Sequence, residues 1–262
     1  MLKRIITAVV ALAVFVPVLY FSQTFIFPIV ISLLSTVACY EMLKCIKLDK
    51  SYLLAIPCLI AAAAIPILAR YLPAAGFTIF LALFCIIIAI SVFGFKKYDV
   101  GTLSIVFYEL FLVIFGFFSI VLLRDAEPYK YLLIFIAAWG TDTFAYFSGY
   151  FLGKRKLCPD ISPKKTIAGA IGGIIGCVFG FVLFGLVLNT WFGGTENLLV
   201  LALTAIPLSI MGQIGDLSAS LIKRRFAIKD YGNIFPGHGG VLDRFDSILP
   251  ISIIFYAITL IF

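Results

Sequence analysis

Residues 77–93 read FTIFLALFCIIIAISVF, a stretch without a single charged side chain. A helix that crosses the hydrocarbon core of a bilayer needs about 20 predominantly apolar residues. Similar stretches recur from one end of the chain to the other, and the polar segments between them leave no room for a soluble domain. The fold class that the sequence predicts is therefore an all-α polytopic membrane protein.

The composition of the whole chain leads to the same prediction. Of its 262 residues, 63% are hydrophobic and 13% are charged, whereas a soluble domain carries about 25% charged residues. A single core cannot bury so much apolar surface, so the bilayer is the solvent that fits. We predict one integral membrane domain over residues 1–262, with N-terminal spans in 1–130 and the large polar loops in 131–262.

The apolar stretches predict about nine transmembrane helices, because the breaks between them carry charged residues, proline or glycine. Each boundary is expected to be correct to a few residues. The expected spans are 5–21, 25–43, 52–68, 77–93, 103–123, 131–152, 166–189, 198–222 and 241–261.

The basic residues predict the orientation of these spans. If the N-terminus is cytoplasmic, all of the 20 Lys and Arg residues except Arg70, Arg124 and Lys130 fall on the cytoplasmic side. Cytoplasmic segments of membrane proteins carry an excess of Lys and Arg. We therefore predict a cytoplasmic N-terminus, a C-terminus outside, and cytoplasmic loops at 153–165 and 223–240. The same bias accounts for the net charge of +7, which does not indicate a nucleic-acid partner.

Acidic residues occur where the bilayer disfavours them. Those within the expected spans or at their edges are Glu41, Glu109, Asp142, Asp216, Asp243 and Asp246. An ionisable side chain at membrane depth is unfavourable unless it is paired, hydrated or bound to a metal ion. For Glu41 and Glu109, helix capping or pairing with a basic residue explains the position equally well. Asp243 and Asp246 are three residues apart, so we expect them on one face of a helix.

Basic residues near these carboxylates indicate a ligand that carries phosphate. Mg²⁺ is typically bound by one or two carboxylates plus phosphate oxygens of a substrate, and Lys and Arg offset the remaining phosphate charge. The metal candidates are Asp216, Asp243 and Asp246, with Asp142 as the weaker one. The phosphate candidates are Lys223, Arg224, Lys229 and Arg244, with Lys164 and Lys165 in the preceding loop.

Glycines give two further predictions. The turn Phe235-Pro236-Gly237-His238-Gly239-Gly240 precedes the last expected span, and consecutive glycines before a helix leave backbone N–H groups free to face an anion. His238, the only histidine, is a base, a phosphate donor or a structural residue. In the span 166–189, the glycines recur with GxxxG spacing, which predicts close helix packing rather than a function.

Two stretches resemble the phosphatidate cytidylyltransferase family. The first runs from Ser220-Leu221-Ile222-Lys223-Arg224 through Lys229-Asp230-Tyr231-Gly232 to residues 235–246. The second comprises Asp142-Thr143, Ala145-Tyr146, Gly149, Gly153, Ser162-Pro163-Lys164-Lys165-Thr166 and Gly169. One position departs from the family pattern, which usually has Glu where this chain has Ala168, so a carboxylate there is not expected to be essential.

The resemblance implies an enzyme that transfers CMP from CTP to phosphatidic acid, releases pyrophosphate and requires Mg²⁺. It implies catalytic roles for Asp243, Asp246, Lys223, Arg224, Lys229 and Arg244, and substrate binding by Lys164, Lys165, Ser220, Gly237, His238, Gly239 and Gly240. Residues 131–262 then form the catalytic part of a multi-pass protein of the cell (inner) membrane, with its active site facing the cytoplasm. A homodimer is one possible assembly.

Two other functions fit some of the same residues. A CTP-dependent kinase of a polyprenol or similar lipid alcohol would need a base for the neutral hydroxyl, whereas the phosphate of phosphatidic acid is already anionic and needs only positioning and charge neutralisation. An ion-coupled secondary transporter would use aspartates within its spans to bind ions. Such transporters are commonly built from internal repeats, and the sequence contains no repeat.

Overall fold

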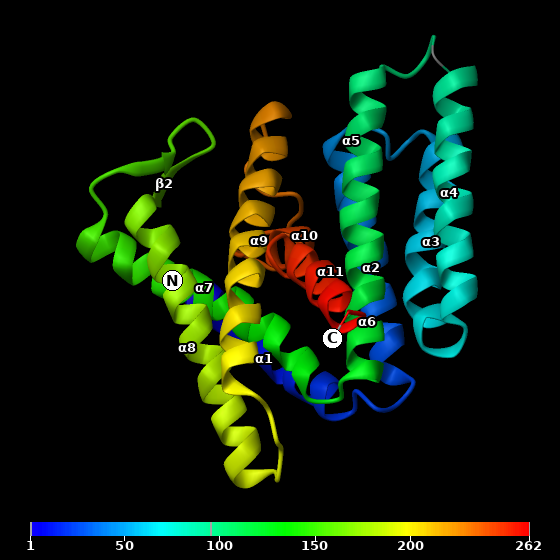
Figure 1. Cartoon of the computed structure of the whole chain (residues 1–262). Coiled ribbons are helices and arrows are strands. Elements are labelled where there is room, and N and C mark those ends of the chain that lie inside the picture. The colour runs from blue at the N-terminus through cyan, green and yellow to red at the C-terminus, as the bar shows by residue number, and fades with distance from the viewer. Residues whose placement is uncertain (1, 95, 262) are drawn as a thin grey trace. The chain divides into compact units, whose positions relative to one another are not determined.

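The computed structural model describes residues 2–94 and 96–261, without the side chains of residues 2–6, 8 and 109. Helices form most of this described chain (Figure 1). Within it, seven helices are long and apolar enough to cross a bilayer. The predicted class, an all-α polytopic membrane protein, is confirmed.

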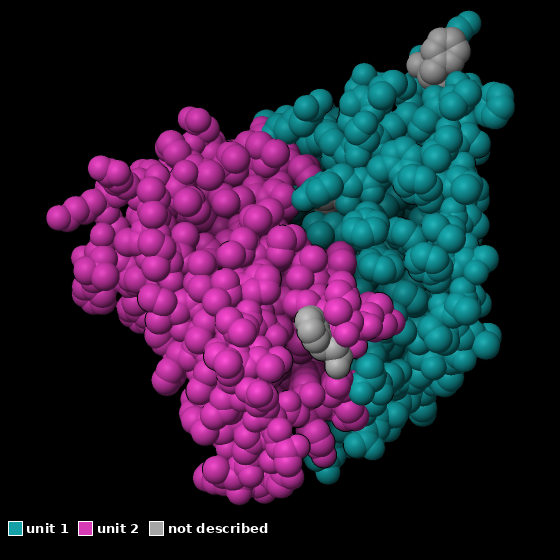
Figure 2. Space-filling model, viewed as in Figure 1, with its two compact units in different colours: residues 1–126, 225–245 teal, residues 127–224, 246–262 magenta. Residues whose placement is uncertain are grey.

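The chain folds into two compact units (Figure 2). Unit 1 comprises Met1–Ala126 and Arg225–Phe245, and unit 2 comprises Glu127–Arg224 and Asp246–Phe262. Unit 1 thus joins the first half of the chain to a short segment near the C-terminus that carries much of the family pattern. Each unit is described by itself below.

Unit 1 is built mainly from long helices. Its elements are α1 (Leu2–Tyr20), α2 (Ile26–Cys45), α3 (Tyr52–Tyr71), α4 (Pro73–Phe93), α5 (Val100–Leu110), the π-helical turn η1 (Phe111–Phe115), α6 (Gly116–Ala126) and the short α10 (Leu242–Phe245). Helices α2 and α3 pack closely because the buried face of α3 carries small residues such as Ala61 and Ala62. Segments α5, η1 and α6 follow one another without a break, so the expected span 103–123 is one helix with a π-helical turn in its middle.

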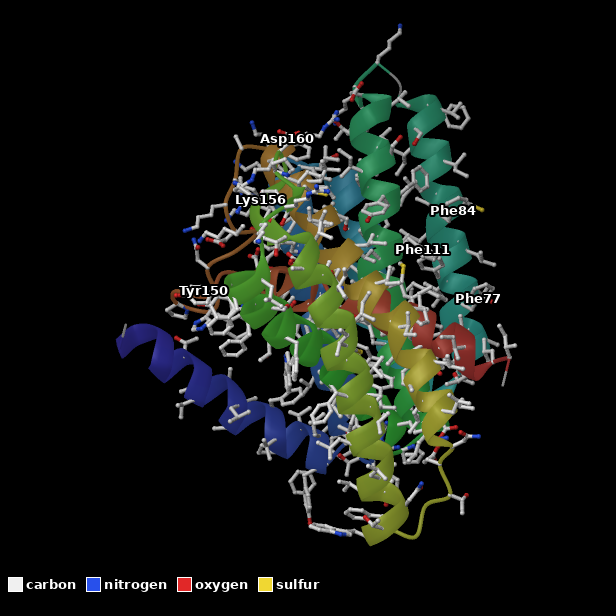
Figure 3. The ribbon with its side chains drawn as sticks, turned by 60° about the vertical axis from the view of Figure 1, so that its left-hand side comes forward. Phe77, Phe84, Phe111, Tyr150, Lys156 and Asp160 are labelled. Atoms are coloured by element: carbon white, nitrogen blue, oxygen red, sulfur yellow. The ribbon has the colours of Figure 1, made fainter. Side chains whose placement is uncertain are left out.

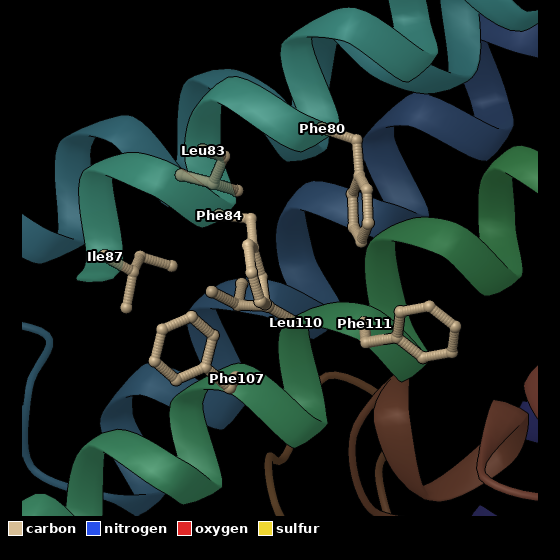
Figure 4. Close-up of a pocket in the computed structure, with 7 residues that line it drawn as sticks. All are labelled: Phe80, Leu83, Phe84, Ile87, Phe107, Leu110 and Phe111. Atoms are coloured by element: carbon tan, nitrogen blue, oxygen red, sulfur yellow. The ribbon is translucent and has the colours of Figure 1, made fainter.

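Aromatic side chains join α4 to the α5–η1 segment. Phe84 packs edge-on against Phe107 with ring centroids 5.1 Å apart, and Phe80 approaches Phe111 at 6.0 Å. These residues, with Leu83, Ile87 and Leu110, line a narrow groove without polar side chains (Figure 4). This part of unit 1 therefore offers packing surface and no polar chemistry.

Unit 2 combines long helices with one small sheet. Its elements are η2 (Lys130–Leu132), α7 (Leu133–Leu152), β1 (Lys156–Cys158), β2 (Ser162–Thr166), α8 (Ile167–Trp191), α9 (Leu198–Arg225) and α11 (Ile248–Thr259). Strands β1 and β2 form an antiparallel hairpin in the expected loop 153–165. In Figure 3, Tyr150 marks the end of α7, and Lys156 and Asp160 mark the hairpin that follows it.

The glycines of α8 allow it to pack tightly on α7. A Cβ atom on Gly173 would lie 3.0 Å from the carbonyl oxygen of Thr141, and one on Gly180 would lie 2.8 Å from Ile136. A Cβ atom on Gly176 would collide with the ring of Phe144. The prediction that these glycines serve helix packing is confirmed, since small residues permit close helix approach in membranes.

The last expected span, 241–261, is not one helix. Helix α10 ends at Phe245, and Asp246 and Ser247 form a turn before α11 begins at Ile248. Pro250 explains the break: it has no N–H to donate to the carbonyl of Asp246 four residues earlier, and its ring crowds that carbonyl. The prediction that Asp243 and Asp246 share one helix face is therefore wrong.

The interruption also affects the number of spans. Helix α11 has 12 residues, which extend about 18 Å at 1.5 Å per residue, whereas the hydrocarbon core is about 30 Å thick. Helix α11 is thus too short to cross a bilayer by itself. The count of nine spans and the sides on which the two termini lie stay predictions.

Candidate active site

In unit 2, the hairpin places Lys165 against α9. Its Nζ atom lies 2.5 Å from Oδ2 of Asp216 and 3.5 Å from the carbonyl oxygen of Gln213. The side chain of Gln213 donates in turn to the carbonyl of Ala170 at 3.2 Å, near the start of α8. Lys164, the residue before Lys165 on β2, is exposed. Two residues singled out in the sequence, Lys165 and Asp216, therefore form an ion pair.

Glycines fix the base of this hairpin. The hydroxyl of Thr166 accepts the Gly169 N–H at 3.0 Å and so caps the start of α8. A Cβ atom on Gly149 would lie 3.0 Å from that hydroxyl oxygen, and one on Gly169 would lie 2.9 Å from the carbonyl oxygen of Ala145. Gly149 and Gly169, which belong to the second family-like stretch, thus allow the end of α7 and the start of α8 to pack closely together next to β2.

Ala168 stands where the family usually has Glu. It is the second residue of α8, beside the cap formed by Thr166, and it is half-buried. A carboxylate at this position would lie at the positive end of the helix dipole. This chain therefore has one negative charge fewer beside the hairpin than the family pattern provides.

Asp246 approaches α9 next to Asp216. A Cβ atom on Gly215 would lie 2.5 Å from the carbonyl oxygen of Asp246 and would collide with Pro250, so only glycine fits there. The Asp246 side chain is 8% exposed, and its Oδ1 atom accepts the Ser247 N–H at 2.8 Å. Unit 2 thus brings Asp216, Lys165 and the Asp246 backbone to one stretch of α9.

The other candidates of unit 2 lie on α7 and at the end of α9. Asp142 is on α7 with an exposed side chain. Ser220 and Lys223 are half-buried in the last turns of α9, and Arg224 is exposed there. Basic residues in the last turn also interact favourably with the helix dipole, so their position has a structural reason beside any role with phosphate.

In unit 1, Asp243 holds the glycine-rich turn together. Its Oδ2 atom accepts the N–H groups of Tyr231 at 2.7 Å and Gly240 at 2.9 Å. Gly237 and Gly239 have φ angles of +80° and +89°, a backbone conformation that favours glycine. A Cβ atom on Gly239 would also lie 2.8 Å from Oδ2 of Asp243. The spacing of glycine and aspartate in this segment is thus required by its own folding.

Glu41, on α2, binds the same segment from the other side. Its two carboxylate oxygens accept the N–H groups of Val241 at 3.1 Å and Leu242 at 2.9 Å. The residue is only 3% exposed. The capping explanation for Glu41 is confirmed, whereas the side chain of Glu109 lies outside those that the structure describes. The sequence pointed to Glu41 only as one of the acidic residues within the expected spans or at their edges.

These hydrogen bonds correct one prediction. The N–H groups of the glycine-rich turn were expected to face an anionic ligand, but the Gly240 N–H donates to the carboxylate of Asp243. The prediction is wrong for this amide because a protein carboxylate already accepts its hydrogen bond. The next two amides, of Val241 and Leu242, donate to Glu41. Helix α10, with four residues, is also too short to provide an extended dipole.

The remaining candidates of unit 1 surround this turn. The Phe235 N–H donates to the Gly239 carbonyl at 2.9 Å, and the His238 N–H donates to the Phe235 carbonyl at 2.8 Å. The Nδ1 atom of His238 is buried, with no hydrogen-bond partner in the described part of the chain. Lys229 and Arg244 are exposed. The turn therefore presents two basic side chains on a backbone that two carboxylates hold in place.

Whether this chain can bind a divalent cation depends on which carboxylates lie close together. Among the described side chains, no three His, Cys, Asp or Glu residues converge on one point. Mg²⁺ commonly takes one or two carboxylates and completes its shell with water and substrate phosphates. Asp216, whose carboxylate lies on α9, fits that smaller requirement, and the backbone of Asp246 contacts the same stretch of the helix at Gly215.

Comparison with known proteins identifies the family of the chain. The model of the family described as "Cytidylyltransferase family" matches residues 2–262. A phosphatidate cytidylyltransferase of Bacillus subtilis is 35% identical over 280 residues, which cover 100% of this chain and 98% of the relative. One from Staphylococcus epidermidis is 35% identical over 94% of both chains. One from Brucella abortus is 43% identical over 58% of this chain and 56% of its own length. The chain belongs to the cytidylyltransferase family.

Proposed function

We propose that this chain catalyses the reaction of a phosphatidate cytidylyltransferase, in which CTP and phosphatidic acid give CDP-diacylglycerol and pyrophosphate. A phosphate oxygen of the lipid attacks the α-phosphorus of CTP. The bond from that phosphorus to the bridging oxygen of the β-phosphate breaks, and pyrophosphate leaves with the electron pair. The attacking phosphate is already anionic, so no side chain has to remove a proton.

The observation that carries this proposal is the Lys165–Asp216 ion pair, at the stretch of α9 that the backbone carbonyl of Asp246 also contacts. Charge neutralisation and positioning account for most of the catalysis of phosphoryl-type transfers. A lysine and a carboxylate at one stretch of a membrane helix provide a cationic contact for phosphate and an oxygen ligand for a metal ion. The carboxylate of Asp246, whose backbone contacts the same stretch, is the second ligand in this proposal. The apolar helices around them keep the acyl chains of a lipid substrate in the bilayer.

The proposal includes Mg²⁺, with Asp216 and Asp246 as its protein ligands. When bound, the ion supplies positive charge that stabilises the transition state. Asp142 is a further candidate, and Asp243 would combine such a role with its hydrogen bonds to Tyr231 and Gly240. Lys165 forms an ion pair with Asp216 and so offsets its charge.

Basic side chains bind the phosphates of CTP and of the lipid in this proposal. They are Lys164, Lys165, Lys223, Arg224, Lys229 and Arg244. Ser220 and the turn Gly237–Gly240 with His238 contribute to substrate binding. For Gly239 and Gly240 this contribution is to shape the turn, since the Gly240 amide already donates to Asp243.

The products of the purified protein test the proposal. With CTP, phosphatidic acid and Mg²⁺, we expect CDP-diacylglycerol and pyrophosphate in equal amounts, and neither product without the lipid. A lipid-alcohol kinase would instead form CDP and a phosphorylated lipid when given a polyprenol. The second pair of products, or no turnover of phosphatidic acid by folded protein, would contradict the proposed function.

We further propose that the active site faces the cytoplasm of a cell (inner) membrane protein with about nine spans. Cys158 lies half-buried on β1 and is a natural reporter for the hairpin. In a variant whose sole cysteine is Cys158, an impermeant thiol reagent is expected to label the protein only after the cells are permeabilised. Thr195→Cys, exposed in the loop before α9, is the matched outside reporter and should label in intact cells. Labelling of Cys158 in intact cells would contradict this orientation.

A further inference from the structure

Glu41, on α2, hydrogen-bonds through its side chain to the segment that carries the family pattern. Its oxygens accept the N–H groups of Val241 at 3.1 Å and Leu242 at 2.9 Å, among the described residues of unit 1. The residue is 3% exposed. Burying a carboxylate costs free energy unless hydrogen bonds compensate the loss of hydration. The two hydrogen bonds to Val241 and Leu242 provide this compensation for Glu41.

The surroundings of Glu41 are shaped around its carboxylate. Cβ atoms added to Gly232 or to Gly240 would collide with its oxygens, so neither position accepts a larger residue without displacing it. Gly232 and Gly240 also approach each other closely, since a Cβ atom on Gly232 would lie 3.1 Å from the Cα atom of Gly240. The carboxylate therefore fills the gap where the two ends of the loop 232–240 meet α2.

Glu41 and Asp243 divide the amides of this segment between them. Asp243 takes the N–H groups of Tyr231 and Gly240, and Glu41 takes the next two, Val241 and Leu242. Hydrogen bonds to an ionised carboxylate are about twice as strong as neutral ones. The loop is consequently fixed at its base, and the exposed basic residues Lys229 and Arg244, which flank it, are held at defined positions.

From these contacts, we infer that Glu41 is a positioning residue for nucleotidyl transfer: it anchors the segment 231–242 to α2 and so sets where Lys229 and Arg244 meet the phosphates. This inference rests on the proposed function. It also gives the N-terminal helices a part in catalysis, although they carry none of the residues that the family pattern singles out. The hydrogen bonds of Glu41 to Val241 and Leu242 are to backbone amides, so it acts through other residues and is not itself catalytic.

Replacing Glu41 by Gln tests this inference. Gln keeps the length of the side chain and one carbonyl oxygen, but its NH₂ group must face a second backbone N–H, so one hydrogen bond is replaced by repulsion. We expect kcat per folded molecule to fall at least about tenfold, while KM for phosphatidic acid changes less than about threefold. Hydrogen exchange should accelerate at Val241 and Leu242, and change less at Tyr231, whose amide is bound by Asp243.

Asp125→Asn is the control for a purely structural role. Asp125 is also a carboxylate of unit 1 and pairs with Arg70 at 2.6 Å and with Arg124 at 3.1 Å. Its replacement is expected to lower the unfolding temperature and to leave kcat per folded molecule within about twofold of the wild type. If Glu41→Gln shows the same pattern as Asp125→Asn, Glu41 is a structural residue only and the inference is overturned.

A second variant keeps the test decisive if Glu41→Gln does not fold. Gly232→Ala leaves the carboxylate charged and pushes it away from the two amides, and Gly232 has no positive φ angle that would forbid alanine. Its kcat is expected to fall in the same direction, whereas a normal kcat would overturn the inference. Inactive wild-type protein would refute the proposed function instead, so the two failures are distinguishable.

Discussion

Asp246→Asn is expected to lower the rate of CDP-diacylglycerol formation at least about a hundredfold, or roughly 2.7 kcal/mol of barrier. Asn retains the size of the side chain and an oxygen that accepts the Ser247 N–H, but it removes the negative charge that a metal ligand needs. A bound metal ion contributes several kcal/mol to the transition state. The measurement is the initial rate of pyrophosphate release as a function of Mg²⁺ concentration, with a chelator control that should stop turnover.

The Asp246 variant should still fold, because removing a charge at membrane depth lowers its desolvation cost. Asp243→Asn is expected to lose at least about a hundredfold as well, but it also perturbs the amides of Tyr231 and Gly240 and is the less direct test. His238→Gln is the control and should cost less than either, since the anionic nucleophile needs no base. Loss of turnover only in the His238 variant would instead support a base-dependent kinase.

Asp216→Asn is expected to cost a similar factor, at least about a hundredfold in rate, with little change in thermal stability. The ion pair with Lys165 is partly exposed, with side-chain exposures of 25% for Lys165 and 33% for Asp216. Such pairs contribute about 1 kcal/mol or less to folding. A large effect on rate with a small effect on unfolding temperature therefore separates a metal ligand from a residue that only braces the hairpin.

Glu196→Gln provides a matched control within unit 2. Glu196 pairs with Lys130 at 3.2 Å, with side-chain exposures of 24% and 29%, so this pair resembles Lys165–Asp216 in chemistry and burial. Its replacement is expected to change the unfolding temperature about as much as Asp216→Asn does and to leave the rate within about twofold. Equal rates for the Asp216 and Glu196 variants would contradict the role assigned to Asp216.

The two carboxylates that hold the turn in unit 1 change how the family pattern is understood. In the sequence, Gly239, Gly240 and Asp243 suggested a place for a phosphate and a metal ion. In the structure, Asp243 and Glu41 bind the amides that a phosphate would otherwise take. Some residues of the family pattern in this stretch are therefore needed to fold the turn. The folded turn then sets the positions of the backbone at Lys229 and Arg244.

The sequence by itself determined the class of the fold and most of its helices. Runs such as 77–93 must be helical in a bilayer, because every backbone polar group in hydrocarbon needs a partner within its own segment. The spacing of glycines such as Gly173 and Gly180 likewise predicted that α8 packs closely on another helix. These predictions succeed because they depend on residues a few positions apart, whose relation a helix fixes.

Only the tertiary structure decided which residues meet. Lys165 and Asp216 come from a hairpin and a distant helix, and Glu41 lies 200 residues before the amide of Val241 that it binds. Hydropathy registers the free energy of transfer into the bilayer and carries no information about the partner of a buried carboxylate. That partner is set by packing between segments far apart in the chain.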